Sequence, residues 1–264
     1  MNNIMGDFYG FSTIPFSKDI RVKDTFKTSA FKDATGMLEL GIEKEDILLL
    51  TGEVGIGKSV VLRSFLEHID AQKFAPVYVR GPSLSPSELY KSILSELHID
   101  PPYTKTQAKF MFYKKVPESK TKPIVIIDDA QEMLDTAFME LKSLINFELD
   151  SKNLLTIILT GQPELLYRIQ MEHLRALCQR IRLSVSMKPM ACDETANYID
   201  HQVSLTGNQT KIFSEAAKAE IFKQTQGNPR KVNSICYNSL LRSALDQKAV
   251  IDSTDICKPF LFQG

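Results

Sequence analysis

Short apolar runs alternate along the first two thirds of the chain with segments whose apolar residues recur every three or four positions. Uninterrupted apolar runs are typical of strands covered on both faces, and the longer spacing is typical of amphipathic helices. The pattern predicts strands at residues 46–52, 76–80, 123–128, 154–161 and 181–187. It predicts helices at residues 30–44, 58–69, 85–97, 104–115, 136–149, 163–169 and 172–181.

Strands that alternate with helices favour a parallel sheet with right-handed crossovers, so the first part of the chain is expected to be α/β. The alternation stops near Pro189, and three helical segments follow at residues 193–207, 214–227 and 229–247. The first two end in glycine and Pro229 opens the third, which are helix stop and start signals. We therefore expect an N-terminal extension at 1–30, an α/β core at 31–190 and a helical domain at 191–264.

Composition narrows the classes of function. Of 264 residues, 43% are hydrophobic and 24% are charged, which suits one or two packed domains. Lys plus Arg and Asp plus Glu each total 32, so nucleic-acid binding would need a local basic patch. The four cysteines lack metal-ligand spacing, the apolar runs are too short to span a membrane, and the N-terminus does not resemble a signal peptide. We expect a cytoplasmic protein that does not enter a membrane.

The segment "TGEVGIGKS" follows the first predicted strand and opens a helix. It fits the pattern G-x-x-x-x-G-K-[ST], in which glycines let backbone N–H groups surround a phosphate and the lysine neutralises its oxygens. The hydroxyl of Ser59 would face Mg²⁺, and the helix N-terminus adds its positive end. The residues expected to hold the nucleotide are Gly52, Val54, Gly55, Ile56, Gly57, Lys58, Ser59 and Val60.

Two carboxylates end the third predicted strand, in "KPIVIIDDAQEM". Asp128 follows four aliphatic residues and is expected to organise Mg²⁺ together with Ser59. Asp129 stands where many nucleoside triphosphatases have the glutamate that orients the attacking water, and its side chain is one methylene shorter. Glu132 could substitute as the base, although it better suits an exposed helix face. At the end of the fourth predicted strand, Gln162 or Thr160 could reach the γ-phosphate or the attacking water. The alternative for Gln162 is a helix N-terminal residue beside Pro163.

Two arginines are candidates for contact with the γ-phosphate. Arg180, in "LCQRIRL", precedes the fifth strand and could stabilise the charge of the transferred phosphoryl group. A plain salt bridge is the alternative, and Arg182 and Arg175 are rivals. Arg230, in "QGNPRKVN", lies in the first turn of a helix, from which it could reach the nucleotide. The alternative for Arg230 is an ordinary surface arginine.

With these residues assembled, the chain resembles the AAA+ ATPases of the ExeA/GspA-like group, which includes transposition regulators related to TnsC, TniB and, more distantly, MuB. The similar segments are "FYGFSTIPF", "LLLTGEVGIGKS", "VIIDDAQ", "IILTGQPEL", "LCQRI" and "TQGNPRKVNSIC". Asp129 departs from the group's Asp-Glu box. Secretion-type members continue into a membrane helix and a cell-wall-binding region, whereas this chain stops at Gly264, which favours a mobile-element regulator.

The resemblance implies a P-loop AAA+ core with a five-stranded parallel sheet and a C-terminal α-helical lid that carries the sensor-2 Arg230. It implies that ATP and Mg²⁺ are cofactors, that Arg180 completes the site of an adjacent subunit, and that a homo-oligomer forms on double-stranded DNA and contacts a transposase. The function expected is ATP-dependent regulation of DNA transposition. A secretion-system assembly ATPase and a stand-alone nucleotide switch are the alternatives.

Two further expectations concern DNA and the rate of hydrolysis. Lys91, Lys105 and Lys109 could form a DNA-binding face that stacked protomers extend into a track; a solvated helix face is an equally good interpretation. The box "IIDDAQ" also resembles that of initiator ATPases of the DnaA type, which use ATP as an assembly signal. It therefore indicates a slow switch rather than a motor.

Overall fold

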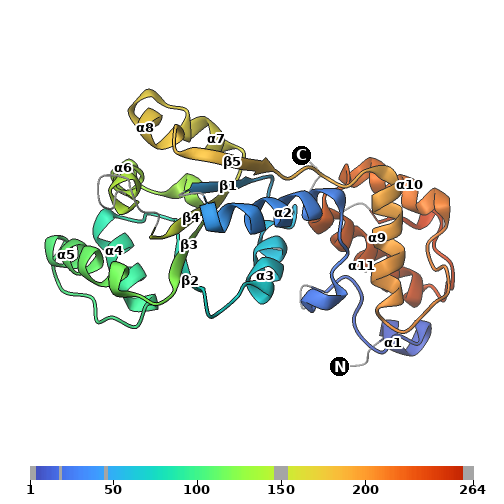
Figure 1. Ribbon diagram of the computed structural model, residues 1–264. Coiled ribbons are helices and arrows are strands. Elements are labelled where there is room, and N and C mark those ends of the chain that lie inside the picture. Colours follow the sequence, from blue (N-terminus) through green and yellow to red (C-terminus); the bar gives the residue numbers. More distant parts are fainter. Residues whose placement is uncertain (1–3, 18–19, 45–46, 146–153, 258–264) are drawn as a thin grey trace. The chain divides into compact units, whose positions relative to one another are not determined.

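The computed structural model describes residues 4–17, 20–44, 47–145 and 154–257. The chain divides into two compact units (Figure 1). The sheet unit comprises Asp33–Val54 and Val61–Met187. The helical unit comprises Met1–Lys32, Gly55–Val60 and Lys188–Gly264. In the described part of the chain, no helix combines the length and the apolar character needed to cross a membrane.

The sheet unit is built on five parallel strands in the order β2-β3-β4-β1-β5. They are β1 (Ile47–Thr51), β2 (Phe74–Arg80), β3 (Lys122–Asp128), β4 (Thr156–Gly161) and β5 (Ile181–Ser186). Every residue of β1 and β4 is buried, as expected for strands that are covered on both faces. The sequence prediction of a five-stranded parallel α/β sheet is confirmed.

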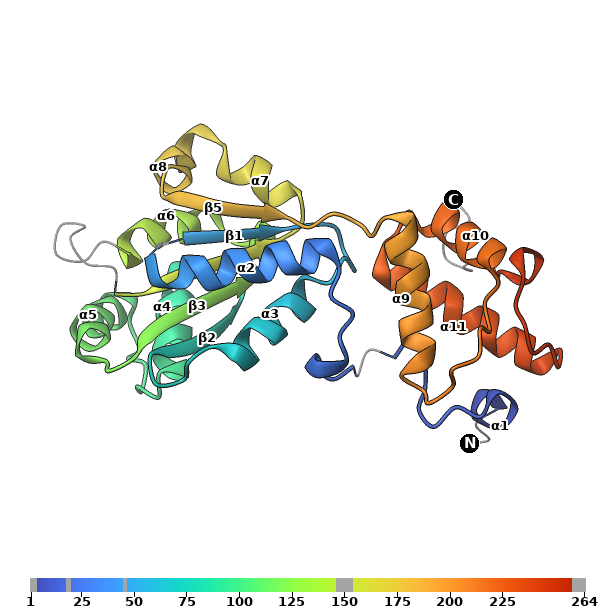
Figure 2. The same cartoon turned by 45° about the vertical axis from the view of Figure 1, so that its right-hand side comes forward.

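Helices cover both faces of the sheet (Figure 2). On one face lie α2 (Ser29–Lys44) and α3 (Lys58–His68), where a Cβ on Gly41 of α2 would meet the Leu48 side chain at 2.4 Å. Alternate strand residues, such as Leu49 and Val125, face the main apolar core on the other side. The helices on that side are α4 (Pro86–Glu96), α5 (Lys105–Lys115), α6 (Asp135–Leu144), α7 (Glu164–Ile169) and α8 (Arg175–Cys178).

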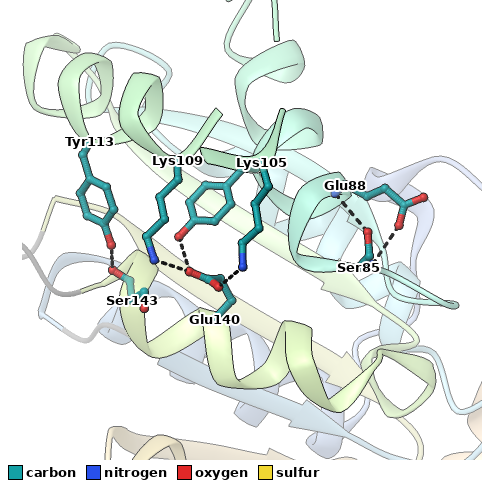
Figure 3. Close-up of polar contacts among 8 residues, drawn as sticks. Ser85, Glu88, Lys105, Lys109, Tyr113, Glu140 and Ser143 are labelled. Carbon is teal, nitrogen blue, oxygen red and sulfur yellow. Dashed lines mark hydrogen bonds and ion pairs between the residues drawn. The ribbon is translucent and has the colours of Figure 1, made fainter. Parts of the chain in front are cut away.

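Local sequence signals predict some of the helix ends correctly and others incorrectly. Ser85 and Glu88 form a capping box at the start of α4 (Figure 3), as their spacing indicates. The helix predicted at 136–149 ends at Leu144, and residues 146–149 lie outside the described residues. The single helix predicted at 172–181 is a 3₁₀ turn (Glu172–Leu174) followed by the four-residue α8, and the chain then turns into β5.

The helical unit consists of α9 (Cys192–Ser204), α10 (Glu215–Thr225) and α11 (Pro229–Leu245), together with the N-terminal α1 (Ile4–Tyr9). The N-terminal aromatics belong to its apolar core: the Phe16 ring packs edge-on against Phe213, and Tyr9 stacks on Phe11. The backbone N–H of Ser12 also donates to the carbonyl of Thr206. Sequence analysis treats residues 1–30 as a separate extension, whereas the structure uses this segment to close the helical core.

The corner between α10 and α11 is tightly constrained. Gly227 has φ +73°, and a Cβ added there would lie 2.0 Å from the carbonyl oxygen of Met190. Its own carbonyl accepts a hydrogen bond from the Met190 N–H at 3.0 Å. Asn228 then caps α11 by accepting from the N–H groups of Arg230 and Lys231. Only glycine fits at position 227 without moving the backbone.

The side chain of Glu140, on α6, joins α4, α5 and α6 (Figure 3). It accepts hydrogen bonds from Lys105 at 2.8 Å, from Lys109 at 2.5 Å and from the phenol of Tyr90 at 2.9 Å. Burial by itself would raise the pKa of this carboxyl, but the three donors outweigh it and lower the pKa to about 2. Tyr113 adds a hydrogen bond from its phenol to the carbonyl of Ser143.

We predict that Gly227→Ala destabilises the helical unit by about 3 kcal/mol, because the methyl group adds a clash with Met190 to the strain of a left-handed backbone. Gly10→Ala is the matched control, because Gly10 has φ +71° and open space around the added Cβ. It should cost only about 1 kcal/mol. Urea unfolding of both variants measures the difference. Equal losses would show that the contact with Met190 carries no cost.

We predict that Glu140→Gln lowers the free energy of unfolding at neutral pH by about 1–2 kcal/mol, because two lysines lose the charge they face. The folded-state pKa lies below the ordinary value of 4.5, so this stability is present above about pH 4.5 and is lost as the pH falls toward 2. The gap between wild type and variant should therefore narrow below pH 4.5. Glu118→Gln, which removes an exposed partner of Lys115, is the control and should change little. A gap that does not depend on pH would contradict the prediction.

Candidate functional site

The glycine-rich loop predicted from the sequence connects β1 to α3. It begins where the N–H of Gly52 donates to the carbonyl of Gly161 at 3.2 Å, which ties the end of β1 to the end of β4. The chain then turns through Gly55 (φ +80°) and Gly57 (φ +109°) before α3 starts at Lys58. Strand, loop and helix are thus in the order that binding of phosphate by backbone N–H groups requires.

The remaining predicted loop residues differ in exposure. The Val54 side chain is 51% exposed and that of Ile56 is 4% exposed. Neither side chain carries a polar group, so both could serve a phosphate only through their N–H groups. Among the polar side chains of the loop, that of Lys58 suits phosphate and that of Ser59 suits a metal ion. Val60 donates its N–H to the Gly57 carbonyl.

Within the helical unit, the first turn of α11 lies against the second half of this loop. The N–H of Arg230 donates to the carbonyl of Gly55 at 3.2 Å. A Cβ on Gly55 would come within 2.5 Å of the Arg230 Cβ and 3.1 Å of the Asn228 side-chain oxygen. Arg230, which the sequence nominates for contact with the nucleotide, is therefore adjacent to the phosphate loop and exposed.

Asp128 is the last residue of β3, and both of its carboxylate oxygens have partners. Oδ1 accepts from the N–H of Asp129 at 3.0 Å, and Oδ2 accepts from the phenol of Tyr78 at 2.7 Å. Tyr78 pairs with Ile126 in the register of β2 and β3, so it is the diagonal neighbour of Asp128 on the same face of the sheet. Sequence analysis did not identify Tyr78, because the contact depends on strand register.

The phenol of Tyr78 keeps its proton over the physiological range. Burial, followed by the hydrogen bond to Asp128 and the negative charge of that residue, raises the pKa of Tyr78 to about 12. The hydroxyl is therefore a neutral donor to Asp128, and it leaves the charge of the carboxylate in place.

Asp129 has a left-handed backbone, with φ 50° and ψ 42°, a conformation that Asp tolerates better than most residues. The chain is packed tightly here, because a Cβ on Gly81 would lie 2.6 Å from the carbonyl oxygens of both Asp128 and Asp129. Gly81 also donates its N–H to the Asp128 carbonyl at 2.7 Å. The Asp129 side chain is exposed, and the glycine opposite holds its backbone in place.

Gln131 joins the ends of β3 and β4. Its Nε2 donates to the Asp129 carboxylate at 3.3 Å, and its Oε1 accepts from the N–H of Gln162 at 3.1 Å. Arg168 fixes the same turn by donating to the Gln131 carbonyl and to Asp135. Gln131, missed by sequence analysis, therefore connects the predicted water-orienting acid with the predicted sensor segment.

At the end of β4, the hydroxyl of Thr160 is fully buried and has no hydrogen-bond partner within the described part of the chain. By strand alternation it faces the same side of the sheet as Asp128, because Ile126 and Ile158 are paired two residues earlier. An unsatisfied buried hydroxyl costs about 1–3 kcal/mol. Of the two sensor candidates, Thr160 carries the polar atom that lacks a partner, and Gln162 has its N–H bound to Gln131.

Arg180 lies at the amino-terminal ends of the strands, whereas the residues described above lie at the carboxyl ends. It directly precedes β5, and its N–H donates to the Leu177 carbonyl at 3.0 Å. β5 runs parallel to β1, so at about 3.3 Å per residue Arg180 is roughly 15–20 Å from the carboxyl ends of the strands. The structure therefore does not bring Arg180 together with Asp128 and Asp129 of its own chain.

The three lysines proposed for DNA each have a partner in the sheet unit. Lys105 and Lys109 are paired with Glu140, and the Lys91 ammonium lies 5.4 Å from the centre of the Tyr103 ring. Sequence analysis allows an open basic face here, but Glu140 compensates part of its charge. Contact of Lys105 or Lys109 with DNA stays a prediction, and it would have to compete with Glu140.

The residues present suit a magnesium nucleotide better than a metal caged by protein. Among the described residues, no group of three or more His, Cys, Asp or Glu side chains could enclose an ion. Mg²⁺ is usually bound by one or two protein oxygens together with phosphates and water. Asp128 and Ser59 are oxygen ligands of this kind, and the loop before Ser59 suits phosphate.

Comparison with known proteins agrees with this description. Residues 42–169 match the family described as AAA domain. General secretion pathway protein A of Aeromonas hydrophila is 29% identical over 242 residues, which cover 89% of this chain. The chain spans 44% of the length of that relative.

Solved structures show the same fold. Cdc6p from Pyrobaculum aerophilum superposes with a TM-score of 0.72 at 15% identity, covering 89% of this chain and 67% of the other. The Walker-type ATPase PABY2304 of Pyrococcus abyssi gives 0.62 at 20% identity, covering 88% and 75%. Drosophila ORC bound to DNA gives 0.63 at 14% identity, covering 96% and 63%. The match over residues 42–169 and the similarity to general secretion pathway protein A together indicate an ATPase of the AAA+ type, and the solved structures show the same fold.

Proposed function

We propose that the chain is a cytoplasmic ATP-dependent switch: it binds ATP with Mg²⁺, assembles into a homo-oligomer in that state, and hydrolyses ATP slowly to disassemble. The observation that carries the proposal is the acidic end of β3. There Asp128 is held on both carboxylate oxygens and Asp129 projects from a constrained left-handed backbone. Such an arrangement supports catalysis by positioning.

The roles of the side chains follow from their chemistry. Lys58 would neutralise phosphate oxygens beside the backbone N–H groups of the loop, and Ser59 and Asp128 would hold the metal. Mg²⁺ offsets negative charge on the β- and γ-phosphates. Thr160 or Gln162 would report on the γ-phosphate from β4, and Arg230 would do so from α11, since its N–H already bonds to the Gly55 carbonyl.

Slow turnover is proposed because Asp129 is shorter than glutamate. A misplacement of about 1 Å can cost about 10²-fold in rate. The chain does not compensate by moving the backbone, because Gly81 is packed against the carbonyls of Asp128 and Asp129. The hydrogen bond from Gln131 occupies one side of the carboxylate and leaves the other oxygen for water.

Assembly is proposed because Arg180 lies far from the acidic end of β3 in its own chain. A cation at the transferred phosphoryl group contributes about 10³–10⁵ in rate when a partner supplies it. Arg180 would meet such a phosphate only on a neighbouring copy. Bound ATP would therefore be shared across an interface and would stabilise the oligomer.

Two functions of the oligomer are considered, and they differ in the partner that it binds. We propose first that it binds double-stranded DNA and acts on a transposase as a regulator of transposition, with Lys91, Lys105 and Lys109 as candidate DNA contacts. Drosophila ORC and Aeropyrum pernix ORC1 share the fold, and their structures are described with DNA. The second candidate, assembly of a secretion system, is favoured by the identity to general secretion pathway protein A.

Duplex DNA binding separates these two functions. A DNA-binding oligomer should retain a labelled duplex with ATP and Mg²⁺, and its affinity should fall steeply as salt is raised. A secretion-system ATPase should not retain the duplex, whether ATP is present or absent. Lys58→Ala controls for binding that does not depend on nucleotide.

We predict that Asp129→Asn abolishes ATP hydrolysis while ATP binding is unchanged, because the amide cannot accept a proton from water. Phosphate release and calorimetry measure the two properties. Glu132→Gln removes a nearby exposed carboxylate and should keep the wild-type rate. If Asp129→Asn hydrolyses ATP as fast as wild type, Asp129 does not orient the water.

We predict that Arg180→Ala binds ATP but hydrolyses it about 10³-fold more slowly. Mixed with Asp128→Ala protein, it should regain part of the wild-type rate, because one interface then holds an intact Arg180 and an intact Asp128. Arg175→Ala, which alters an exposed arginine on α8, should behave as wild type. No recovery at any ratio, in oligomers shown to be mixed, would place the role of Arg180 within its own chain.

A further inference from the structure

The contact between Tyr78 and Asp128 is not needed to pack the sheet. Tyr78 is 47% exposed, whereas its neighbours Val77 and Val79 point into the apolar core. A phenylalanine at this position would place the same ring on the same face. What the tyrosine adds is one hydroxyl, and the structure directs it to Asp128 Oδ2 at 2.7 Å.

That hydroxyl completes the support of the carboxylate. The N–H of Asp129 holds Oδ1 at 3.0 Å, so the two donors together prevent rotation of the group. An ionised carboxylate has about four lone-pair positions, and these donors occupy two of them. The others stay available for a metal ion or its bound water.

The Tyr78 phenol is also a chemically suitable donor for a carboxylate that binds a metal ion. A lysine or arginine at this position would cancel the negative charge that attracts Mg²⁺. The phenol is an uncharged donor, so it fixes the orientation of Asp128 without adding a positive charge beside it. Donors that orient a ligating carboxylate commonly contribute about 10–100-fold to metal affinity.

We propose that Tyr78 is a positioning residue that orients Asp128 for the divalent metal and thereby tightens metal binding at the nucleotide site. The inference rests on the proposed nucleotide function. It gives β2 a role in the site, in addition to the glycine-rich loop and to the two acids at the end of β3. It also predicts that the effect of the hydroxyl appears in metal dependence rather than in nucleotide affinity without metal.

Tyr78→Phe tests the inference. Tyr103→Phe is the matched control, because Tyr103 is 92% exposed and lies in the segment between α4 and α5, outside the strands that form the site. Binding of a fluorescent ATP analogue to each protein is measured in EDTA, and in separate samples without EDTA the binding of Mn²⁺ to the loaded protein is followed by electron paramagnetic resonance. Tyr78→Phe should need about tenfold more Mn²⁺ for half-saturation. Tyr103→Phe should match wild type, and all three should bind the analogue equally in EDTA.

The outcomes separate the inference from the proposed function. Equal Mn²⁺ affinity in wild type and Tyr78→Phe overturns the inference and leaves the nucleotide site standing. Loss of analogue binding in EDTA by Tyr78→Phe, or a lowered unfolding temperature, shows a general structural role and also overturns it. Failure of wild type to bind the analogue with or without metal refutes the proposed function itself.

Discussion

The parallel direction of the five strands is the constraint on which the site depends. It places the carboxyl ends of β1, β3 and β4 at one edge of the sheet, where the hydrogen bond from Gly52 to Gly161 joins the start of the phosphate loop to the sensor strand. Ligands of open α/β sheets bind beyond this edge. The same constraint puts Arg180, which precedes β5, at the other edge. One topological fact thus separates the residues proposed to act within a chain from Arg180, which is proposed to act on a neighbouring copy.

Hydrogen bonds from neighbouring strands then give the acidic residues their separate characters. Asp128 is fixed by Tyr78 of β2, and Asp129 is bound through Gln131 to the end of β4. The left-handed backbone of Asp129 is held by its packing against Gly81. A rigid first acid suits metal binding, and a short, exposed second acid suits slow activation of water. The chemistry proposed for a switch therefore follows from how the two side chains are supported.

Sequence reasoning succeeded where the signal is local. The apolar runs of β1, β3 and β4 and the glycines of the phosphate loop are each visible within about ten residues. Tyr78 and Gln131 escaped notice because their roles depend on register between separate strands. Glu140 was missed because its partners lie on two other helices, α4 and α5, although it pairs with Lys105 and Lys109 and so makes them less available to DNA. The N-terminal aromatics could be recognised as apolar, but their place in the helical core depends on contacts with residues about 200 positions away, such as that between Phe16 and Phe213.

The most direct test of the account is a structure of the protein with Mg²⁺ and an ATP analogue that is not hydrolysed. The account predicts phosphates on the N–H groups of Gly52–Ser59, with the metal beside Ser59 and Asp128 while Tyr78 still donates to Asp128. It also predicts a water next to Asp129 and Arg180 of a second copy at the γ-phosphate. A nucleotide bound elsewhere, or a metal that does not approach Asp128, would contradict it.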